Sequence, residues 1–245
     1  MSIFSLNGKV AVVTGGFRGI GRAMASGLKD FGADVVVVDI EIDQKIKEED
    51  GFLFIKCNIC EKKEVEEATA LILEKYKHID ILVNDAGVIR RSQAVDMPLA
   101  DWEKVFSVNA TGTFLFCQAV GRQMIRQGKG KIINIASNYA ESGVENCVAY
   151  CSSKGAVVSL TRTLAIEWAK YGINVNAVSP AVTRTSMTAK KFEDPQLLKQ
   201  FIDTIPMGRV LEPGDLVGAV VFLASNASDM VTGHNLHVDG GYLAR

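Results

Sequence analysis

The feature of this chain that most constrains its fold is the alternation of short apolar runs with helical patterns. The runs are rich in valine and isoleucine, as in strands buried on both faces, and cover residues 10–13, 34–39, 52–57, 79–83, 131–136, 173–178 and 235–238. Helical patterns cover residues 19–31, 61–76, 99–127, 147–170 and 216–225, with an irregularity expected near Gly112. Such alternation predicts parallel strands joined by right-handed crossovers. We therefore expect an α/β fold: a single Rossmann-type domain over residues 1–245, with a doubly wound parallel sheet of about seven strands and helices on both faces.

Composition and charge exclude several classes of protein. The net charge is −1, so no basic surface for nucleic acid is indicated. No apolar run reaches the length of a membrane span, and the first residues lack the pattern of a signal peptide. The five cysteines and three histidines (His78, His234 and His237) form no zinc-ligand pattern beyond Cys57-x2-Cys60, which predicts reduced thiols. We expect a cytoplasmic protein that binds no metal, nucleic acid or membrane.

The carboxyl ends of the predicted strands are the candidate binding edge, because open α/β sheets bind their ligands there. The first strand is followed by a glycine-rich turn, residues 14–21, which leads into a helix. Glycines permit a tight turn and let backbone N–H groups approach a pyrophosphate at the helix N-terminus. The turn therefore predicts a dinucleotide site; the alternative is a glycine-rich turn that binds nothing.

Two residues bear on which dinucleotide is bound. Asp39 ends the second strand, where a carboxylate accepts the ribose hydroxyls of NAD and repels the 2′-phosphate of NADP. Arg18, within the glycine turn, favours that phosphate. Because Asp39 stands where the ribose would lie, we expect NAD as cofactor and NADP as the less favoured alternative. An ordinary strand-end turn is the competing interpretation of Asp39.

Polar or small residues also follow the later strands. Asn58 follows the third, residues 84–87 the fourth, Ser137 the fifth and residues 179–185 the sixth. The Asn58 amide suits an adenine edge, the small residues at 84–87 suit a closely packed ribose, and the Ser137 hydroxyl suits a substrate oxygen. Each alone is explained as a loop or cap residue. Their placement at successive strand ends favours one shared site.

A tyrosine–lysine pair lies near the start of the helix predicted at 147–170. Tyr150 and Lys154 are four residues apart, so one helical turn places both side chains on one face. An ammonium beside a phenol favours the phenolate and lowers the tyrosine pKa, which suits acid–base chemistry on alcohols and ketones. Alone, such a pair is usually a solvated neighbour pair; a cofactor site beside it would give it a role.

Taken together, these features resemble the short-chain dehydrogenase/reductase family over essentially the whole chain. The matching motifs are residues 14–21, Asn-Asp-Ala-Gly at 84–87, Asn109, Ser137, Tyr150-x3-Lys154, residues 180–185 and Asp-Gly-Gly at 239–241. The resemblance implies that Tyr150 is the acid–base, that Lys154 lowers its pKa and binds the nicotinamide ribose, that Ser137 orients the substrate oxygen and that Asn109 holds a water behind Lys154. The cofactor-binding residues that we expect are Thr14, Gly15, Arg18, Gly19, Ile20, Gly21, Asp39, Asn58, Ile59, Asn84, Ala86, Gly87, Tyr150, Lys154, Pro180, Val182, Thr183 and Thr185.

Three positions depart from the family's usual pattern. Asp85 replaces an asparagine, Asn58 an aspartate and Ala181 a glycine. No catalytic group is lost, so we expect these departures to affect cofactor affinity more than chemistry.

Within the family, residues 87–91 and 241–245 resemble sugar-acid dehydrogenases, such as the 2-dehydro-3-deoxygluconate and gluconate 5-dehydrogenases, and polyol dehydrogenases. Arg90 and Arg91 suit a sugar-acid carboxylate, with a solvated surface pair as an equal alternative. Ser137 and Tyr150 complete the expected substrate contacts.

We therefore expect an NAD-dependent oxidoreductase that interconverts a secondary alcohol and a ketone on a sugar acid or polyol. An NADPH-dependent 3-oxoacyl-carrier-protein reductase is the alternative, favoured by Arg18 and opposed by Asp39. A non-catalytic NAD-sensing module is a more remote alternative, because the expected catalytic set is intact. The polar segment 181–212 is expected to be irregular and to cover the substrate. The resemblance implies a homotetramer, and the apolar residues of the two long helices agree with burial against other subunits.

Overall fold

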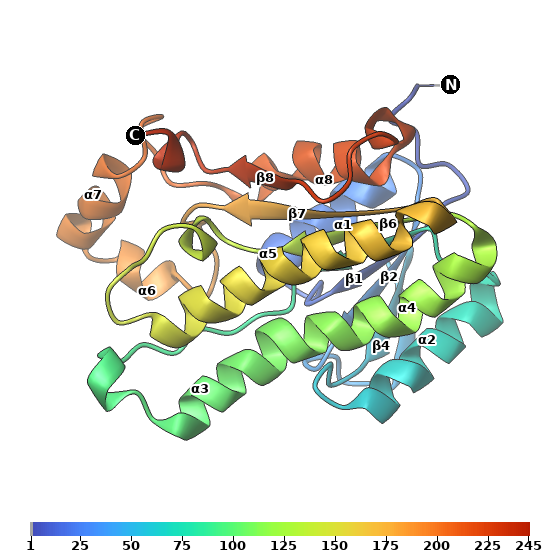
Figure 1. The fold of residues 1–245 in the computed structure, drawn as a ribbon, viewed down its shortest axis with the longest axis horizontal. Coiled ribbons are helices and arrows are strands. Elements are labelled where there is room, and N and C mark those ends of the chain that lie inside the picture. Colours follow the sequence, from blue (N-terminus) through green and yellow to red (C-terminus); the bar gives the residue numbers. More distant parts are fainter. Residues whose placement is uncertain (1) are drawn as a thin grey trace.

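Eight strands form one sheet at the centre of the protein, and helices cover both of its faces in the computed structural model, which describes residues 2–245 (Figure 1). The strands are β1 (Val10–Thr14), β2 (Asp34–Asp39), β3 (Ile46–Glu49), β4 (Phe52–Lys56), β5 (Ile81–Asn84), β6 (Gly130–Ile135), β7 (Ile173–Pro180) and β8 (Asn235–Val238). Their order across the sheet is β3-β4-β2-β1-β5-β6-β7-β8. Every neighbouring pair is parallel except β3 with β4. The predicted single-domain doubly wound fold is confirmed.

The helices divide between the two faces of the sheet. They are α1 (Gly19–Asp30), α2 (Lys62–Tyr76), α3 (Leu99–Phe106), α4 (Thr113–Gln127), α5 (Val148–Trp168), α6 (Ala189–Phe192), α7 (Pro195–Asp203) and α8 (Val217–Ala224). Helices α2, α4 and α5 pack on one face, and α1 and α8 on the other (Figure 1).

Alternate residues of each central strand supply two separate cores. In β1, Val10 and Val12 belong to the core under α2, α4 and α5, whereas Ala11 and Val13 belong to the core under α1 and α8. Side chains of a strand point to opposite faces with a period of two, so a strand buried on both faces has to be apolar throughout. This explains why the strands stand out in the sequence as continuous runs.

Two parts of the fold differ from the sequence-based expectation. Strand β3 is an additional, antiparallel edge strand, whose residues Ile46 to Glu49 pair with Ile55 to Phe52. The segment 181–212 is not irregular throughout, because it contains α6 and α7. Helix α7 begins where the Asp194 carboxylate accepts the Gln196 N–H at 2.8 Å, with Pro195 in the first turn.

The irregularity expected near Gly112 is confirmed. Helices α3 and α4 are joined by a π-helical stretch, Ser107–Gly112, which widens the helix and includes Asn109. None of the helices in residues 2–245 is long and apolar enough to cross a membrane. Among these residues, no group of three or more His, Cys, Asp or Glu is placed to hold a metal ion.

Candidate active site

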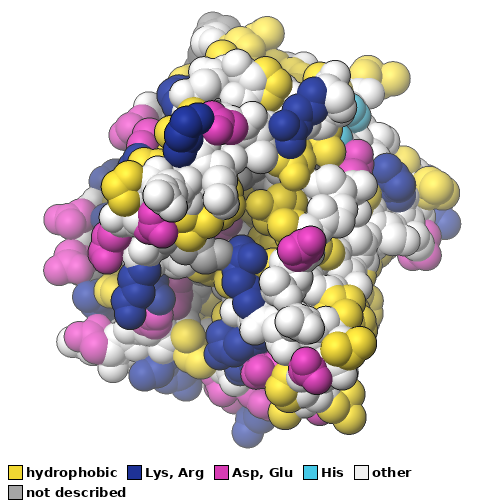
Figure 2. Space-filling view, turned by 90° about the vertical axis from the view of Figure 1, so that its left-hand side faces the viewer, with side chains coloured by type: hydrophobic (Ala, Val, Ile, Leu, Met, Phe, Trp, Pro, Cys, Tyr) yellow, Lys and Arg dark blue, Asp and Glu magenta, His cyan; other side chains and the backbone are white. Residues whose placement is uncertain are grey.

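The carboxyl ends of the parallel strands lie on the left of Figure 1, and Figure 2 views that edge from the front. A recess lies near the middle of this surface, with hydrophobic side chains inside it and Lys or Arg side chains beside it (Figure 2). The expected site residues follow β1, β2, β4, β5, β6 and β7, or come from α5 and the π-helical stretch. The fold therefore collects them at one edge of the sheet, as expected for an open α/β sheet.

The glycine turn is built against the segment that follows β5. Gly15 has φ +68, and a Cβ there would come within 2.7 Å of the Ala86 Cα, so a larger residue would push the two segments apart. The Thr14 hydroxyl accepts hydrogen bonds from the Asp85 N–H (3.2 Å) and the Ala86 N–H (3.4 Å). Helix α1 starts directly after this turn, so the backbone N–H groups of its first turn lie at the binding edge.

Asp39 is the carboxylate at the end of β2. Its two oxygens accept hydrogen bonds from the Phe17 N–H (3.2 Å) and the Glu41 N–H (3.0 Å), which fix its orientation between the glycine turn and the loop after β2. Arg18 does not contact Asp39: its Nη2 lies 2.5 Å from Glu41 Oε1. The two residues that the sequence sets against each other are thus separated by a third, Glu41, which we did not predict.

The segment after β5 places Asp85 beside the cofactor residues. Asp85 is partly buried and accepts a hydrogen bond from the Gly21 backbone N–H. Burial raises its pKa; the nearby Asp39 carboxylate raises it further, while Lys154 and the Gly21 hydrogen bond oppose the rise. The Asn84 side chain points into the sheet instead, where its Nδ2 donates to Asn134 Oδ1 at 2.9 Å. Asn84 therefore joins β5 to β6 through its Nδ2, whereas its buried Oδ1 has no hydrogen-bond partner among the described residues.

Lys154 is a buried ammonium in the second turn of α5, with a relative exposure of 5%. Its Nζ donates to the Ile135 carbonyl oxygen at 2.7 Å and lies 5.9 Å from the Tyr150 ring centroid. Burial lowers the pKa of Lys154, and the Asp85 carboxylate opposes this. The strand end, the helix and the segment after β5 together hold this charge where it can face a ligand.

Tyr150 and Ser137 form the hydroxyl pair of the site. Ser137, which follows β6, is buried, and its Oγ accepts the Tyr139 N–H at 3.1 Å. Burial raises the pKa of Tyr150 to about 12, and the Ser137 hydrogen bond opposes this rise. The sequence predicts a lowered pKa from Lys154. In the structure the pKa of Tyr150 is raised instead, because the loss of solvent on burial outweighs the Ser137 hydrogen bond and the nearby Asp85 raises it further.

Asn109 lies in the π-helical stretch and is fully buried. Its Oδ1 accepts the Val88 N–H at 2.8 Å, and its Nδ2 donates to the Val88 oxygen at 2.9 Å and to Ser153 Oγ at 3.0 Å. A Cβ on Gly87 would lie 3.4 Å from Asn109 Oδ1 and 3.6 Å from Lys154 Nζ, so the two side chains meet at this glycine. The amide thus fixes the chain after β5; a water behind Lys154 would have to use the remaining lone pair of Oδ1.

The chain after β7 closes the other side of the glycine turn. Thr183 is buried, and its carbonyl oxygen accepts the Thr188 hydroxyl at 2.7 Å. The Thr185 N–H also bonds to Thr188 Oγ1, at 3.0 Å, which folds this segment into a compact loop. Gly19 has φ +60, and a Cβ there would lie 3.6 Å from Thr185 Cγ2. This contact brings Thr185 to the glycine turn, and the predicted residues Pro180, Val182 and Thr183 precede it in the same segment.

The remaining cofactor residues follow β4. Asn58 is partly buried, and its Oδ1 accepts the Cys60 N–H at 3.2 Å, while Ile59 is buried in the core under α2 and α4. The Asn58 oxygen thus takes part in a local turn and keeps one lone pair for an adenine amino group.

The two arginines that were predicted as a pair lie in different surroundings. Arg90 Nε is 3.6 Å from Asp101 Oδ1, and its Nη1 donates to the Ile89 oxygen, so it is bound at the surface. Burial raises the pKa of Tyr139 to about 12, and Arg91 is close enough to lower it. Tyr139 is two residues from Ser137 in the sequence, and Arg91 is the member of the pair that acts on its pKa.

Two further residues near the site were not predicted. Glu141 lies between Ser137 and Tyr150, and its Oε1 accepts Asn235 Nδ2 of β8 at 2.9 Å. Asn235 Oδ1 in turn accepts the Ser179 hydroxyl of β7 at 2.7 Å. These contacts tie the loop before α5 to the last two strands. They join residues far apart in the sequence, so no local pattern could have shown them.

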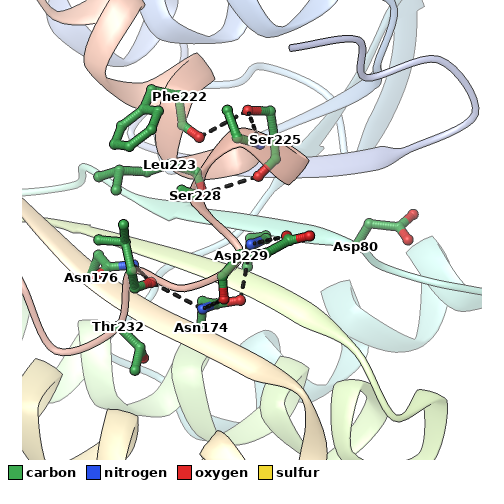
Figure 3. Close-up of polar contacts among 12 residues, drawn as sticks. Asp80, Asn174, Asn176, Phe222, Leu223, Ser225, Ser228, Asp229 and Thr232 are labelled. Carbon is green, nitrogen blue, oxygen red and sulfur yellow. Dashed lines mark hydrogen bonds and ion pairs between the residues drawn. The ribbon is translucent and has the colours of Figure 1, made fainter. Parts of the chain in front are cut away.

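A second cavity, of about 530 Å³, lies at the opposite, amino-terminal edge of the sheet. Two of its lining residues bond to each other, since Asn174 Nδ2 donates to the Asp229 oxygen at 3.0 Å (Figure 3). Next to the cavity, Ser228 Oγ donates to the Leu223 oxygen at 3.0 Å. These bonds fasten the loop between α8 and β8 to the end of α8 and to β7. The cavity is lined by groups with a structural role and lies away from the predicted site residues.

The residues of the carboxyl edge fit a nicotinamide dinucleotide. The N-terminus of α1 offers backbone N–H groups to a pyrophosphate, and the side chain of Arg18, the N-cap residue, pairs with Glu41. Asp39 presents an oriented carboxylate at the position expected for a ribose, and Lys154 presents an ammonium. Fold and site therefore define a dinucleotide-dependent α/β oxidoreductase.

Comparison with known proteins identifies the family. A family model described as "Enoyl-(Acyl carrier protein) reductase" matches residues 15–243. The chain is 42% identical to an NAD-dependent glycerol dehydrogenase of Listeria innocua serovar 6a, over 98% of this chain and 95% of that protein. It is also 42% identical to the 2-dehydro-3-deoxy-D-gluconate 5-dehydrogenase of Escherichia coli K12, over 100% of this chain and 99% of that protein. A gluconate 5-dehydrogenase from Burkholderia cenocepacia J2315, crystallised with NADP and tartrate, has a TM-score of 0.92 and 36% identity, over 99% of this chain and 98% of that chain. The chain belongs to the short-chain dehydrogenase/reductase family.

Proposed function

We propose that this protein is an NAD-dependent oxidoreductase that interconverts a secondary alcohol and a ketone on a sugar acid or a polyol. One observation carries the proposal: the Ser137–Tyr150 hydroxyl pair lies beside the buried Lys154 ammonium at the cofactor edge of the sheet. Relatives that match the chain over its whole length are named for glycerol and for 2-dehydro-3-deoxy-D-gluconate, which supports the substrate class.

Tyr150 is the proton donor and acceptor of the reaction. Because burial keeps its pKa near 12, the phenol is protonated at neutral pH and is ready to donate to a ketone oxygen held by Ser137. In alcohol oxidation the Tyr150 oxygen has to accept a proton, so Tyr150 must first be a phenolate. The Lys154 ammonium stabilises this phenolate, and the Ile135 carbonyl oxygen holds Lys154 in place. A bound nicotinamide supplies the hydride donor or acceptor.

Asp39 supports NAD as the preferred dinucleotide. Its oxygens are oriented by the Phe17 and Glu41 N–H groups, and a carboxylate in that position accepts ribose hydroxyls and repels a 2′-phosphate. The alternative, an NADPH-dependent 3-oxoacyl-carrier-protein reductase, was favoured by Arg18, whose guanidinium is bound to Glu41. The surroundings of both residues therefore favour NAD.

Arg91 is the candidate for recognising a sugar-acid carboxylate. It is exposed and lies close to Tyr139, which neighbours the hydroxyl pair, whereas Arg90 is engaged by Asp101. A guanidinium binds a carboxylate through two parallel hydrogen bonds, so Arg91 can orient an acid substrate toward Tyr150.

Helices α6 and α7 form the part of segment 181–212 that covers the substrate in this proposal. Phe192 of α6 and Phe201 of α7 stack edge to face at 6.1 Å, so the two short helices form one unit above the loop after β7. We also infer a homotetramer, supported by exposed apolar residues on the long helices: Phe114 of α4 is 40% exposed and Ile166 of α5 81%. A cytoplasmic location is supported by the thiols of Cys57, Cys60, Cys117 and Cys151, which form no disulfide.

The test is a turnover screen with the purified protein. Sugar acids, polyols and hydroxyacyl thioesters are each assayed with NAD⁺ and with NADP⁺, and the Tyr150→Phe variant serves as the blank. We expect turnover of a sugar acid or a polyol with NAD⁺. Turnover confined to thioesters with NADP⁺ would establish the reductase alternative instead. Dinucleotide binding without any turnover would establish the non-catalytic sensor.

A further inference from the structure

The loop after β2 carries a second carboxylate that the expected cofactor chemistry does not use. Glu41 lies two residues beyond Asp39, and its Oε1 is 2.5 Å from Nη2 of Arg18 in the glycine turn. The Glu41 N–H also donates to Asp39 Oδ1 at 3.0 Å. Glu41 therefore contacts both residues that bear on the choice of dinucleotide: Asp39 through its backbone and Arg18 through its side chain.

The contact between Glu41 and Arg18 bears on dinucleotide binding because of where Arg18 lies. Arg18 is the N-cap of α1, where a dinucleotide pyrophosphate would bind, and the Asp39 side chain reaches the same turn through the Phe17 N–H. A 2′-phosphate would have to lie beside Asp39, within reach of the neighbouring guanidinium, and a guanidinium is the side chain that best matches a phosphate. Held by Glu41, Arg18 presents fewer free donors to such a phosphate.

The local charge works in the same direction. Asp39 and Glu41 supply two negative charges and Arg18 one positive charge, so this group as a whole repels a phosphate dianion. The Arg18 and Glu41 side chains are 62% and 40% exposed, so water screens their pairing and the pair adds little to the stability of the fold. The contact therefore acts on the ligand more than on the fold.

We propose that Glu41 is a specificity-determining residue, which withdraws Arg18 from the 2′-phosphate of NADP and so strengthens the preference for NAD that Asp39 sets. This inference rests on the proposed function only in requiring that the carboxyl edge binds a nicotinamide dinucleotide. It assigns the preference to three residues acting together, and makes Arg18 a latent phosphate ligand that Glu41 restrains.

The test is equilibrium binding of NAD⁺ and of NADP⁺ to the full chain by isothermal titration calorimetry, which needs no substrate. Glu41→Gln keeps the shape of the side chain and removes its charge. We expect Glu41→Gln to lower the Kd for NADP⁺ by up to about fivefold, the size of the exposed ion pair that restrains Arg18, and to leave the Kd for NAD⁺ nearly unchanged.

A double-mutant cycle separates this mechanism from a general change of charge. In the Arg18→Ala background, Glu41→Gln should give no such gain for NADP⁺, because the arginine that it releases is absent. The matched control is Asp43→Asn, which removes a negative charge from the same loop, where Asp43 Oδ1 lies 3.7 Å from Lys47 Nζ. We expect at most a small gain from Asp43→Asn.

Two results would overturn the inference while leaving the proposed function intact: an equal gain from Glu41→Gln and Asp43→Asn, or a gain from Glu41→Gln that persists without Arg18. A Glu41→Gln protein that binds both dinucleotides as the unmodified chain does would also overturn it. If neither dinucleotide binds to any of these proteins, the proposed function fails, and the inference fails with it.

Discussion

Buried charged residues lie at both edges of the central sheet, at the amino ends and at the carboxyl ends of its strands, but they have different roles there. At the amino edge, the buried Asp80 accepts the Val10 N–H at 3.0 Å and lies 3.1 Å from His78 Nε2, with Lys129 and Lys9 at 3.4 and 3.6 Å. At the carboxyl edge, the Lys154 ammonium bonds to a carbonyl oxygen, and Asp85 bonds to a backbone N–H. Asp80 is therefore surrounded by cations, whereas Asp85 and Lys154 are only partly compensated.

This difference separates a charge that supports the fold from charges available to a ligand. A buried carboxylate with several donors holds strands together, because its lone pairs are satisfied. At the carboxyl edge, burial shifts the pKa values of Asp85, Lys154 and Tyr150 toward the neutral form of each group. Perturbed groups gathered in a recess are typical of a functional site. We therefore expect substitutions at the amino edge to change stability and substitutions at the carboxyl edge to change chemistry.

The largest effect is expected at Tyr150. Tyr150→Phe removes the hydroxyl that exchanges the proton, so kcat should fall by ~10²–10⁴-fold, the usual contribution of general acid–base catalysis. Calorimetric binding of the dinucleotide should stay nearly unchanged, since the ring and Lys154 remain. Substantial turnover by this variant would contradict the assignment of the carboxyl edge as the catalytic edge.

The next effect is a loss of stability at the amino edge. Asp80→Asn keeps one acceptor oxygen, which can replace Oδ2 for the Val10 N–H and His78. The amide NH2 then stands where Oδ1 faced the Lys9 and Lys129 ammonium groups, so those contacts are lost. We expect the free energy of unfolding to fall by about 1–3 kcal/mol, the cost of an unsatisfied buried group, with kcat/KM retained. Urea unfolding monitored by circular dichroism measures the loss.

The control for this substitution is Asp229→Asn at the same edge. Its carboxylate is 64% exposed and contacts Lys131 Nζ at 2.8 Å, so solvent limits its contribution. A loss as large for Asp229→Asn as for Asp80→Asn would show that burial is not what distinguishes Asp80.

A smaller effect should separate the two arginines. If Arg91 holds a substrate carboxylate, Arg91→Ala should raise KM for a sugar acid by about tenfold, equivalent to the loss of one charge-assisted contact, and leave KM for a polyol unchanged. Arg90→Ala, which removes the contact with Asp101, is the matched control and should change neither value. An equal rise of KM for acid and polyol would show that Arg91 shapes the pocket without reading the carboxylate.

Most of the fold could be predicted from the sequence because strands buried on both faces have to be apolar throughout. Strand β3 could not, since Ile-Lys-Glu-Glu has no such run and its strand conformation depends on pairing with β4 at an exposed edge. Helices α6 and α7 were missed because they are short and rest on a local cap at Asp194 and on the Phe192–Phe201 contact.

The position of candidate site residues at the carboxyl edge could be predicted where they end or follow a strand in chain order, as Asp39 and Ser137 do. It was not predicted where contacts cross the fold. The pairing of Arg18 with Glu41, and the different surroundings of Arg90 and Arg91, depend on side-chain directions that no spacing specifies. The direction of the Tyr150 pKa shift was missed for a similar reason, because the exclusion of solvent is a property of the folded chain.

The sharpest test of the comparison between the edges is a pH dependence of stability, and it concerns Asp85. Its pKa in the folded protein is raised by burial, so the folded chain keeps a proton that the unfolded chain loses near pH ~4. The stability that this proton contributes is present at acid pH and is lost as the pH rises toward neutrality, with a slope of at most ~1.4 kcal/mol per pH unit.

Asp85→Asn cannot lose that proton, so its stability relative to the unmodified protein should increase between about pH 5 and pH 7. Melting temperatures of the variant and the unmodified protein, measured across this pH range, give the difference in stability. The control is Asp101→Asn: the Asp101 carboxylate is 44% exposed, so its difference in melting temperature should be nearly independent of pH. Lys154 changes this difference in the same direction. Its pKa is lowered in the folded protein, so it destabilises the fold as the pH falls. Without Asp85 its pKa is lowered further, so this contribution also makes the Asp85→Asn variant more stable as the pH rises. A difference that shrinks toward neutral pH would mean that Lys154 fully compensates Asp85, and the carboxyl edge would then resemble the paired cluster around Asp80.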